Sequence, residues 1–195
     1  SVAKVARSAG VSVGVIYKYF GDKQAFFLAC VRHSLELLDA TLREAVPEGA
    51  DAETSICALV PALIAAARQH GNYNVLYNEI TSGSCREFAP ELAREIESRT
   101  ARLYTRLFET AKEAGALAPG LAPEAAAFFF DNLLMMLQFS YSCDYYQHRM
   151  RLYCGENAAW NDEMMADQLT RFLLGAMRGE GSCNISLPTT SGPPA

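Results

Sequence analysis

Side chains that can bind nucleic acid gather in the first two dozen residues of the chain. Residues 1–23 contain one acidic side chain, Asp22, and four basic ones, Lys4, Arg7, Lys18 and Lys23. This segment therefore carries a local charge of +3 in a chain whose net charge is −5, so the remainder carries −8. Lysine and arginine bind phosphate oxygens, and a lysine also donates to guanine O6 or N7. The charge distribution predicts attraction to phosphate at one end of the molecule.

The spacing of small and apolar residues in the same segment predicts how those side chains are positioned. Ala6 lies one helical turn before Gly10, and Ile16 follows six residues later. A small side chain lets two helices cross closely, glycine accepts the positive φ of a tight turn, and isoleucine returns to the same core. Ser12 is placed to cap the second helix with its hydroxyl. The pattern is typical of a helix-turn-helix, which indicates DNA binding.

This segment resembles the DNA-binding head of the TetR family of bacterial regulators. The family pattern is an isoleucine-alanine pair, Ala-Gly-Val-Ser, Tyr-x-Tyr-Phe and a lysine, and it is matched here by Val5-Ala6, Ala9 to Ser12, Tyr17 to Phe20 and Lys23. The family head has three helices. Because the helix that normally precedes Val2 is absent, we expect the sequence to begin inside this domain. Tyr19 and Phe20 are expected in the core, and Tyr17 against phosphate.

The resemblance assigns base contacts to the second helix of the motif. Gly14 allows a close approach to the major groove, and Lys18 donates to base edges there. Val13 and Val15 stand where relatives more often have polar residues, so readout is expected to use thymine methyl groups and DNA shape. The expected DNA-binding residues are Ser12, Val13, Gly14, Val15, Tyr17, Lys18 and Lys23.

The remainder of the chain is predicted to be helical. Apolar residues recur at three- and four-residue steps while strand patterns are scarce, so the predicted fold class is all-α. Helices are expected over 22–46, 52–70, 73–81, 90–114, 123–153 and 162–177, with the arginines and glutamates of 90–114 on a solvated face. The expected organisation is a partial helix-turn-helix head at 1–23, a connecting helix at 24–46, a ligand-binding and dimerisation body at 47–178, and a disordered tail at 179–195.

The two predicted helices at 123–153 and 162–177 are apolar nearly all round. Such helices must be covered on both sides, which indicates an intermolecular four-helix bundle in a homodimer. The order of the helices resembles that of the TetR body, in which the middle helices enclose a ligand and the last two dimerise.

A ligand site is expected among the middle helices of the body. Its predicted residues are Cys57, Tyr73, Tyr77, Phe129, Leu133 and Met136. These walls are aromatic and thioether-rich with few charges, which favours a small hydrophobic or aromatic effector. The resemblance implies a repressor that binds a near-palindromic operator and is released when this effector binds.

Other function classes find less support in the sequence. No catalytic constellation, phosphate loop or paired zinc knuckle occurs at a suitable spacing, so we expect no enzyme activity, cofactor or metal. The apolar run 125–141 is interrupted by Asp131, Asn132 and Gln138, so no membrane span is expected. Six cysteines without a C-x-x-C pair and the lack of a secretion signal favour a reducing cytoplasm. The alternatives left open are a helical ligand-binding or adaptor dimer that does not bind DNA and, after it, a helical enzyme.

Overall fold

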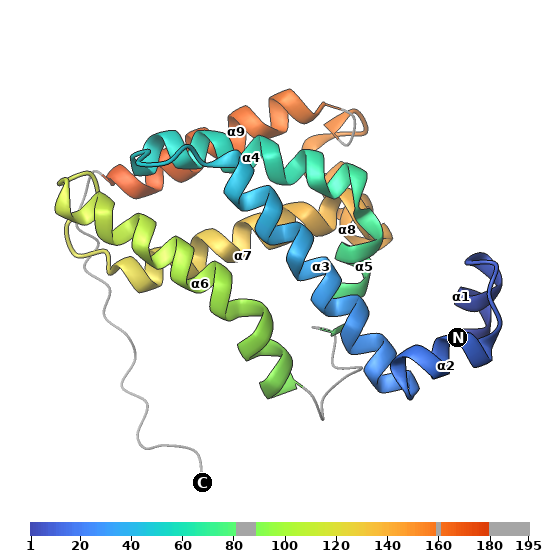
Figure 1. The fold of residues 1–195 in the computed structure, drawn as a ribbon. Coiled ribbons are helices and arrows are strands. Elements are labelled where there is room, and N and C mark those ends of the chain that lie inside the picture. The colour runs from blue at the N-terminus through green and yellow to red at the C-terminus, as the bar shows by residue number, and fades with distance from the viewer. Residues whose placement is uncertain (81–88, 159–160, 180–195) are drawn as a thin grey trace, which may run out of the picture.

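The computed structural model describes residues 1–80, 89–158 and 161–179, and the ordered elements among them are helices without any strand. In chain order they are α1 (Val2–Ser8), α2 (Val13–Phe20), α3 (Lys23–Ala45), α4 (Ala52–Gln69), α5 (Gly71–Glu79), α6 (Ala89–Glu113), α7 (Pro123–Ser142), α8 (Asp144–Cys154) and α9 (Asp162–Arg178) (Figure 1). The all-α prediction is confirmed. The tail expected at 179–195 lies outside the described residues, apart from Gly179.

Side-chain caps fix where several of these helices begin. The Ser12 hydroxyl accepts a hydrogen bond from the Val15 amide at 3.3 Å, so α2 starts where the sequence predicts. Asp22 caps α3 through the Ala25 amide at 2.7 Å. A carboxylate at this position satisfies an otherwise unpaired amide and interacts favourably with the helix dipole.

The single helix predicted over 123–153 is wrong, because the structure divides it into α7 and α8. Cys143 separates them with extended backbone angles, φ −115° and ψ 128°. The Gln147 side chain donates to the Tyr141 carbonyl at 3.2 Å, which satisfies an acceptor near the end of α7. Apolar periodicity continues across this one-residue break, so the sequence pattern did not reveal it.

The core of the body is built around α4. Five apolar side chains at helical spacing are almost fully buried along it, namely Ile56, Leu59, Val60, Leu63 and Ile64. The helix packs against α3, α6, α7 and α9, which supply further members of the same core. Because α4 contacts elements on several sides, it fixes the relative positions of the helices that carry the sites described below.

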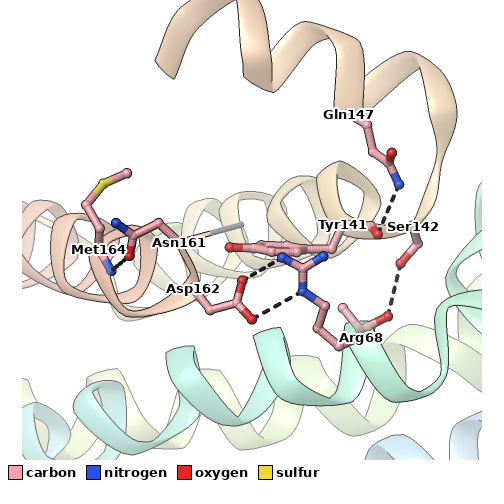
Figure 2. Close-up of polar contacts among 8 residues, drawn as sticks. Arg68, Tyr141, Ser142, Gln147, Asn161, Asp162 and Met164 are labelled. Atoms are coloured by element: carbon pink, nitrogen blue, oxygen red, sulfur yellow. Dashed lines mark hydrogen bonds and ion pairs between the residues drawn. The ribbon is translucent and has the colours of Figure 1, made fainter. Parts of the chain in front are cut away.

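A polar cluster joins α4, α7 and the start of α9 (Figure 2). The Arg68 guanidinium donates twice to the Asp162 carboxylate, at 2.6 Å from Nη2 and 3.2 Å from Nε. The same guanidinium lies over the Tyr141 ring, 4.4 Å from its centroid. Asn161 caps α9 through the Met164 amide at 3.0 Å. These contacts hold the first turn of α9 against α4 and α7.

Helix α3 connects the body to the amino-terminal helices. Figure 1 shows α1 and α2 beyond one end of α3, away from the body helices. In the body, Val31 and Leu35 of α3 are buried against Ile80, Leu92 and Ile96. One continuous helix therefore contacts both the head and the interior of the body. Among the described residues, no helix combines the length and apolar character needed to cross a bilayer.

Candidate DNA-binding head and ligand cavity

In the head α1 packs on α2, and α2 packs in turn on α3. Ala6 and Ile16 are buried at the crossing of α1 and α2, with exposed fractions of 2% and 6%. Gly10 adopts φ 68° in the turn between them, a conformation that side chains with a Cβ rarely adopt. The helix-turn-helix geometry predicted from Ala6, Gly10 and Ile16 is therefore present.

Helix α2 presents most of the predicted DNA-binding side chains to solvent. Gly14, Val15, Tyr17 and Lys18 are exposed, and Val13 is half-buried. Ser12, the N-cap of α2, and Lys23, the first residue of α3, are also exposed. A Cβ added at Gly14 would meet only the Ser12 hydroxyl, 3.7 Å away, so the backbone there is open to a groove. The predicted DNA-binding residues thus lie along α2, at its N-cap and at the first residue of α3.

The expectation that Tyr19 and Phe20 belong to the core is wrong, since their side chains are 78% and 39% exposed. Phe20 covers only part of its ring by packing on Phe26 of α3, with ring centroids 5.0 Å apart. Two short helices and the start of α3 provide few surfaces on which to bury three aromatic rings. Tyr19 is therefore available to a partner in the same way as Tyr17.

A cavity of about 90 Å³ lies between α3, α5, α6 and α7. Helix α3 contributes Val31, Ser34, Leu35 and Leu38; α5 contributes Tyr73, Asn74 and Tyr77, with Ile80 just beyond it; α6 contributes Ile96, Glu97, Thr100 and Tyr104; and α7 contributes Asp131, Met135 and Gln138. The walls are mostly apolar or aromatic, with a small number of polar groups, as is common in sites for small molecules.

The structure brings two of the six predicted ligand-binding residues to this cavity, Tyr73 and Tyr77. The other four do not line it. Cys57 is exposed on α4, and Phe129 and Leu133 are exposed on α7. Met136 is half-buried, while its neighbour Met135 lies in the cavity wall.

The cavity contains carboxylates that the sequence analysis did not place there. Glu97 was expected on the solvated face of its helix, but it is half-buried and accepts a short hydrogen bond from the Tyr77 hydroxyl. Asp131 faces the same space from α7. Burial and the nearby Glu97 carboxylate raise the pKa of Asp131 to about 6. Burial also raises the pKa of the Tyr77 hydroxyl, and the hydrogen bond to Glu97 adds to that effect.

A second, more open cavity of about 370 Å³ adjoins the first between α6 and α7. The two cavities share Tyr77, Glu97, Thr100, Asp131 and Met135. The second also includes Phe128, whose side chain is 64% exposed, so it reaches the surface of the molecule. This arrangement offers an entry path from solvent to the carboxylates.

Large apolar side chains are exposed on the helices predicted to dimerise. Phe128 and Phe129 on α7 are 64% and 60% exposed, and Phe172 on α9 is 63% exposed. By contrast, Leu169 of α9 packs against the core of its own chain. Exposed phenylalanines on two helices are typical of a surface that another protein chain covers.

Comparison with known proteins decides the family. The model of the family described as bacterial regulatory proteins, tetR family, matches residues 1–30, which include the whole helix-turn-helix. The chain is 32% identical over 135 residues to the HTH-type transcriptional regulator BetI of Paraburkholderia phymatum, and this match covers 68% of each protein. The chain belongs to the TetR family.

Further relatives of this TetR-family chain agree with that conclusion. The BetI regulator of Paraburkholderia xenovorans is 33% identical over 108 residues, which cover 55% of the chain and only 54% of that relative. The ketosteroid transcriptional regulator KstR2 of Mycobacterium tuberculosis has a similar fold, with a TM-score of 0.65 and 18% identity over 92% of the chain and 85% of its own. A tetR-family regulatory protein from Rhodococcus RHA1 gives a TM-score of 0.67 and 19% identity over 89% and 84% of the two chains.

Membership of the TetR family places the protein among helix-turn-helix transcriptional regulators, which act by binding DNA and are not enzymes. The helical enzyme considered from the sequence is thereby set aside. The structural likenesses, at below one-fifth identity, support the fold and carry no information on which ligand the cavity takes.

Proposed function

We propose that this TetR-family chain is a homodimeric repressor that binds a near-palindromic operator and is released from it by a small molecule in the cavity. The observation that carries the proposal is the exposed α2 helix, which sits on a buried Ala6–Ile16 crossing and is surrounded by exposed cationic side chains. A helix of this kind enters the major groove, and lysines beside it bind the phosphates.

Helix α3 supports a mechanism that links the cavity to the head. Val31, Ser34 and Leu38 of α3 line the cavity, while Phe26, one to three turns earlier on the same helix, packs on Phe20 of α2. A ligand that favours a different position of α3 therefore also favours a different position of the head. In a dimer this alters the spacing of the two heads, which must match successive major grooves.

Helices α7 and α9 are proposed to form the dimer interface. Their exposed residues Phe128, Phe129 and Phe172 would be covered by the same helices of a second copy. Asp131 and Phe128 both belong to α7, so the wall of the cavity and the interface are parts of one helix. The apolar walls of the cavity support the small hydrophobic or aromatic body expected for the effector from the sequence.

A footprint on the DNA upstream of the protein's own gene tests this function. Protection of two half-sites separated by about one helical turn of DNA, lost when an effector is added, is the expected result. A stable dimer that protects no DNA would instead support the ligand-binding adaptor considered from the sequence.

A further inference from the structure

We propose that the effector is an organic cation, an ammonium group on a small apolar body, held by Glu97, Asp131 and the Tyr104 hydroxyl. This inference rests on the proposed function of the cavity as the effector site. It adds a charge requirement that neither the sequence pattern nor the fold supplies.

The charge balance of the cavity is the first argument. Glu97 and Asp131 both line it, and none of its described lining residues is a lysine, arginine or histidine. Asp131 forms no hydrogen bond or salt bridge with any described residue, although its side chain is largely removed from water. An uncompensated carboxylate in such a place is unfavourable unless it takes up a proton or a cation arrives. The cavity therefore lacks one positive charge that a ligand can supply.

The Tyr104 hydroxyl is the second argument. Its residue is only 2% exposed, it lines the cavity, and its hydroxyl has no hydrogen-bond partner among the described residues. Burial and the charges of Asp131 and Glu97 raise its pKa, so the hydroxyl keeps its proton and its oxygen can accept from an ammonium N–H. Because this hydroxyl borders the cavity and is not bonded within the described part of the chain, it is open to a ligand in that space.

Four other polar side chains of the cavity wall already donate hydrogen bonds within the protein. Ser34 donates to the Val31 carbonyl at 2.6 Å, and Asn74 donates to the Ser142 hydroxyl at 2.9 Å. Thr100 and Gln138 donate to carbonyls of their own helices at 3.3 Å and 3.4 Å. The acceptors best placed for a cation are thus the Tyr104 hydroxyl and the two carboxylates, of which Glu97 also accepts from Tyr77. The rings of Tyr73 and Tyr77 provide aromatic surface of the kind that cations favour.

A metal ion fits this site less well than an organic cation. Hard divalent cations need six or more oxygen ligands or several waters, whereas in the described part of the chain no three His, Cys, Asp or Glu side chains gather as a metal site would require. The aliphatic wall of Val31, Leu35 and Ile96 matches a carbon body instead.

Protonation of Asp131 makes the expected binding depend on pH. The other titratable groups that face it are Glu97 and Tyr104 from α6 and Tyr73 and Tyr77 from α5, while α3 contributes no titratable residue. Burial raises the pKa of the Tyr77 and Tyr104 hydroxyls, so both keep their protons near neutral pH and Asp131 governs the response. Affinity for a cation should fall as the pH drops through about 6, where Asp131 takes up its proton.

A charge-matched probe series tests the proposal on the whole protein. Benzylamine, benzyl alcohol and benzoate share one ring and differ in charge, and methylamine and propylamine extend the cationic set to smaller bodies. Calorimetry at pH 7.5 should show at least one amine binding ten-fold or more tightly than benzyl alcohol, with benzoate weakest. Asp131→Asn and Glu97→Gln should each weaken amine binding about ten-fold and leave benzyl alcohol unchanged. Glu109→Gln removes an exposed carboxylate of α6 outside both cavities and should change nothing.

The outcomes separate this inference from the proposed function. Equal or tighter binding of the alcohol or benzoate, no binding by any amine, or full amine affinity in Asp131→Asn would overturn the cation assignment even if operator DNA is bound. Selective amine binding by a protein that ignores its upstream DNA would uphold the cation site and overturn the repressor.

Discussion

Replacing Asp131 with asparagine should stabilise the ligand-free protein near neutral pH. In the folded state the pKa of this carboxyl is raised from the ordinary 3.8 to about 6 by burial and by Glu97. A difference of about two units corresponds to about 3 kcal/mol when the group is ionised, and allowance for its partial exposure reduces this to about 1–2 kcal/mol. Asparagine has a similar shape without the charge, so that cost disappears.

The pH dependence of the free energy of unfolding shows in which direction the substitution should act. The folded protein binds the Asp131 proton more tightly than the unfolded chain does, so this residue favours folding most below pH ~4, and its contribution is lost as the pH rises to about 6. The difference in free energy of unfolding between Asp131→Asn and the original protein should therefore grow from near zero at low pH to about 1–2 kcal/mol at pH 7.5.

Urea unfolding at pH 4.5, 5.5, 6.5 and 7.5 measures this difference. Glu109→Gln is the matched control, because it removes one exposed carboxylate from the adjoining helix α6 and should shift stability by less than about 0.5 kcal/mol at every pH. A variant Asp131→Asn that is less stable than the original at pH 7.5, or equally shifted at all four pH values, would show that Asp131 is not an uncompensated buried charge.

Four further substitutions probe the head, the interface and the α9 contact. Lys23→Ala should weaken binding about equally on all DNA sequences and lower by about one unit the slope of log binding constant against log salt concentration. Lys18→Ala should instead relax the preference for one base pair of the operator. Anisotropy titrations at several salt concentrations measure both effects. Phe172→Asp should place an unpaired charge in the proposed interface at a cost of about 3–5 kcal/mol and give a monomer by light scattering, and an intact dimer would exclude α9 from the interface. Arg68→Ala removes the paired hydrogen bonds to Asp162 and should lower the free energy of unfolding by about 1 kcal/mol, while an unchanged urea midpoint would mean that the pair contributes nothing.

Local signals predicted the head and the helix starts well. Ser12 and Asp22 cap helices where their positions indicate, because capping depends on only three or four neighbouring residues. The Ala6, Gly10 and Ile16 spacing likewise describes a contact between adjacent helices, and all three residues take the expected positions. Tyr19 shows the limit, because its burial depends on what surrounds the head rather than on the motif.

The cavity was harder to predict because it depends on how distant helices face each other. Phe129 and Met135 both follow an apolar pattern, yet Phe129 points to solvent and Met135 into the cavity. Asp131 was the available signal: a carboxylate inside an apolar helix is unfavourable without a role. In the sequence this carboxylate argued only against a membrane span. Glu97 carried no such signal, since α6 is rich in charges along its length.

Binding of the protein to the DNA upstream of its own gene tests the central claim most directly. In an anisotropy titration at about 0.15 M salt, the upstream fragment should bind about 10³-fold or more tightly than random DNA of equal length. The cationic probe that calorimetry identifies as binding should then weaken operator affinity by about 5- to 150-fold, and operator DNA should weaken binding of the probe by the same factor. Equal affinity for both DNA fragments, with or without the probe, would contradict the account.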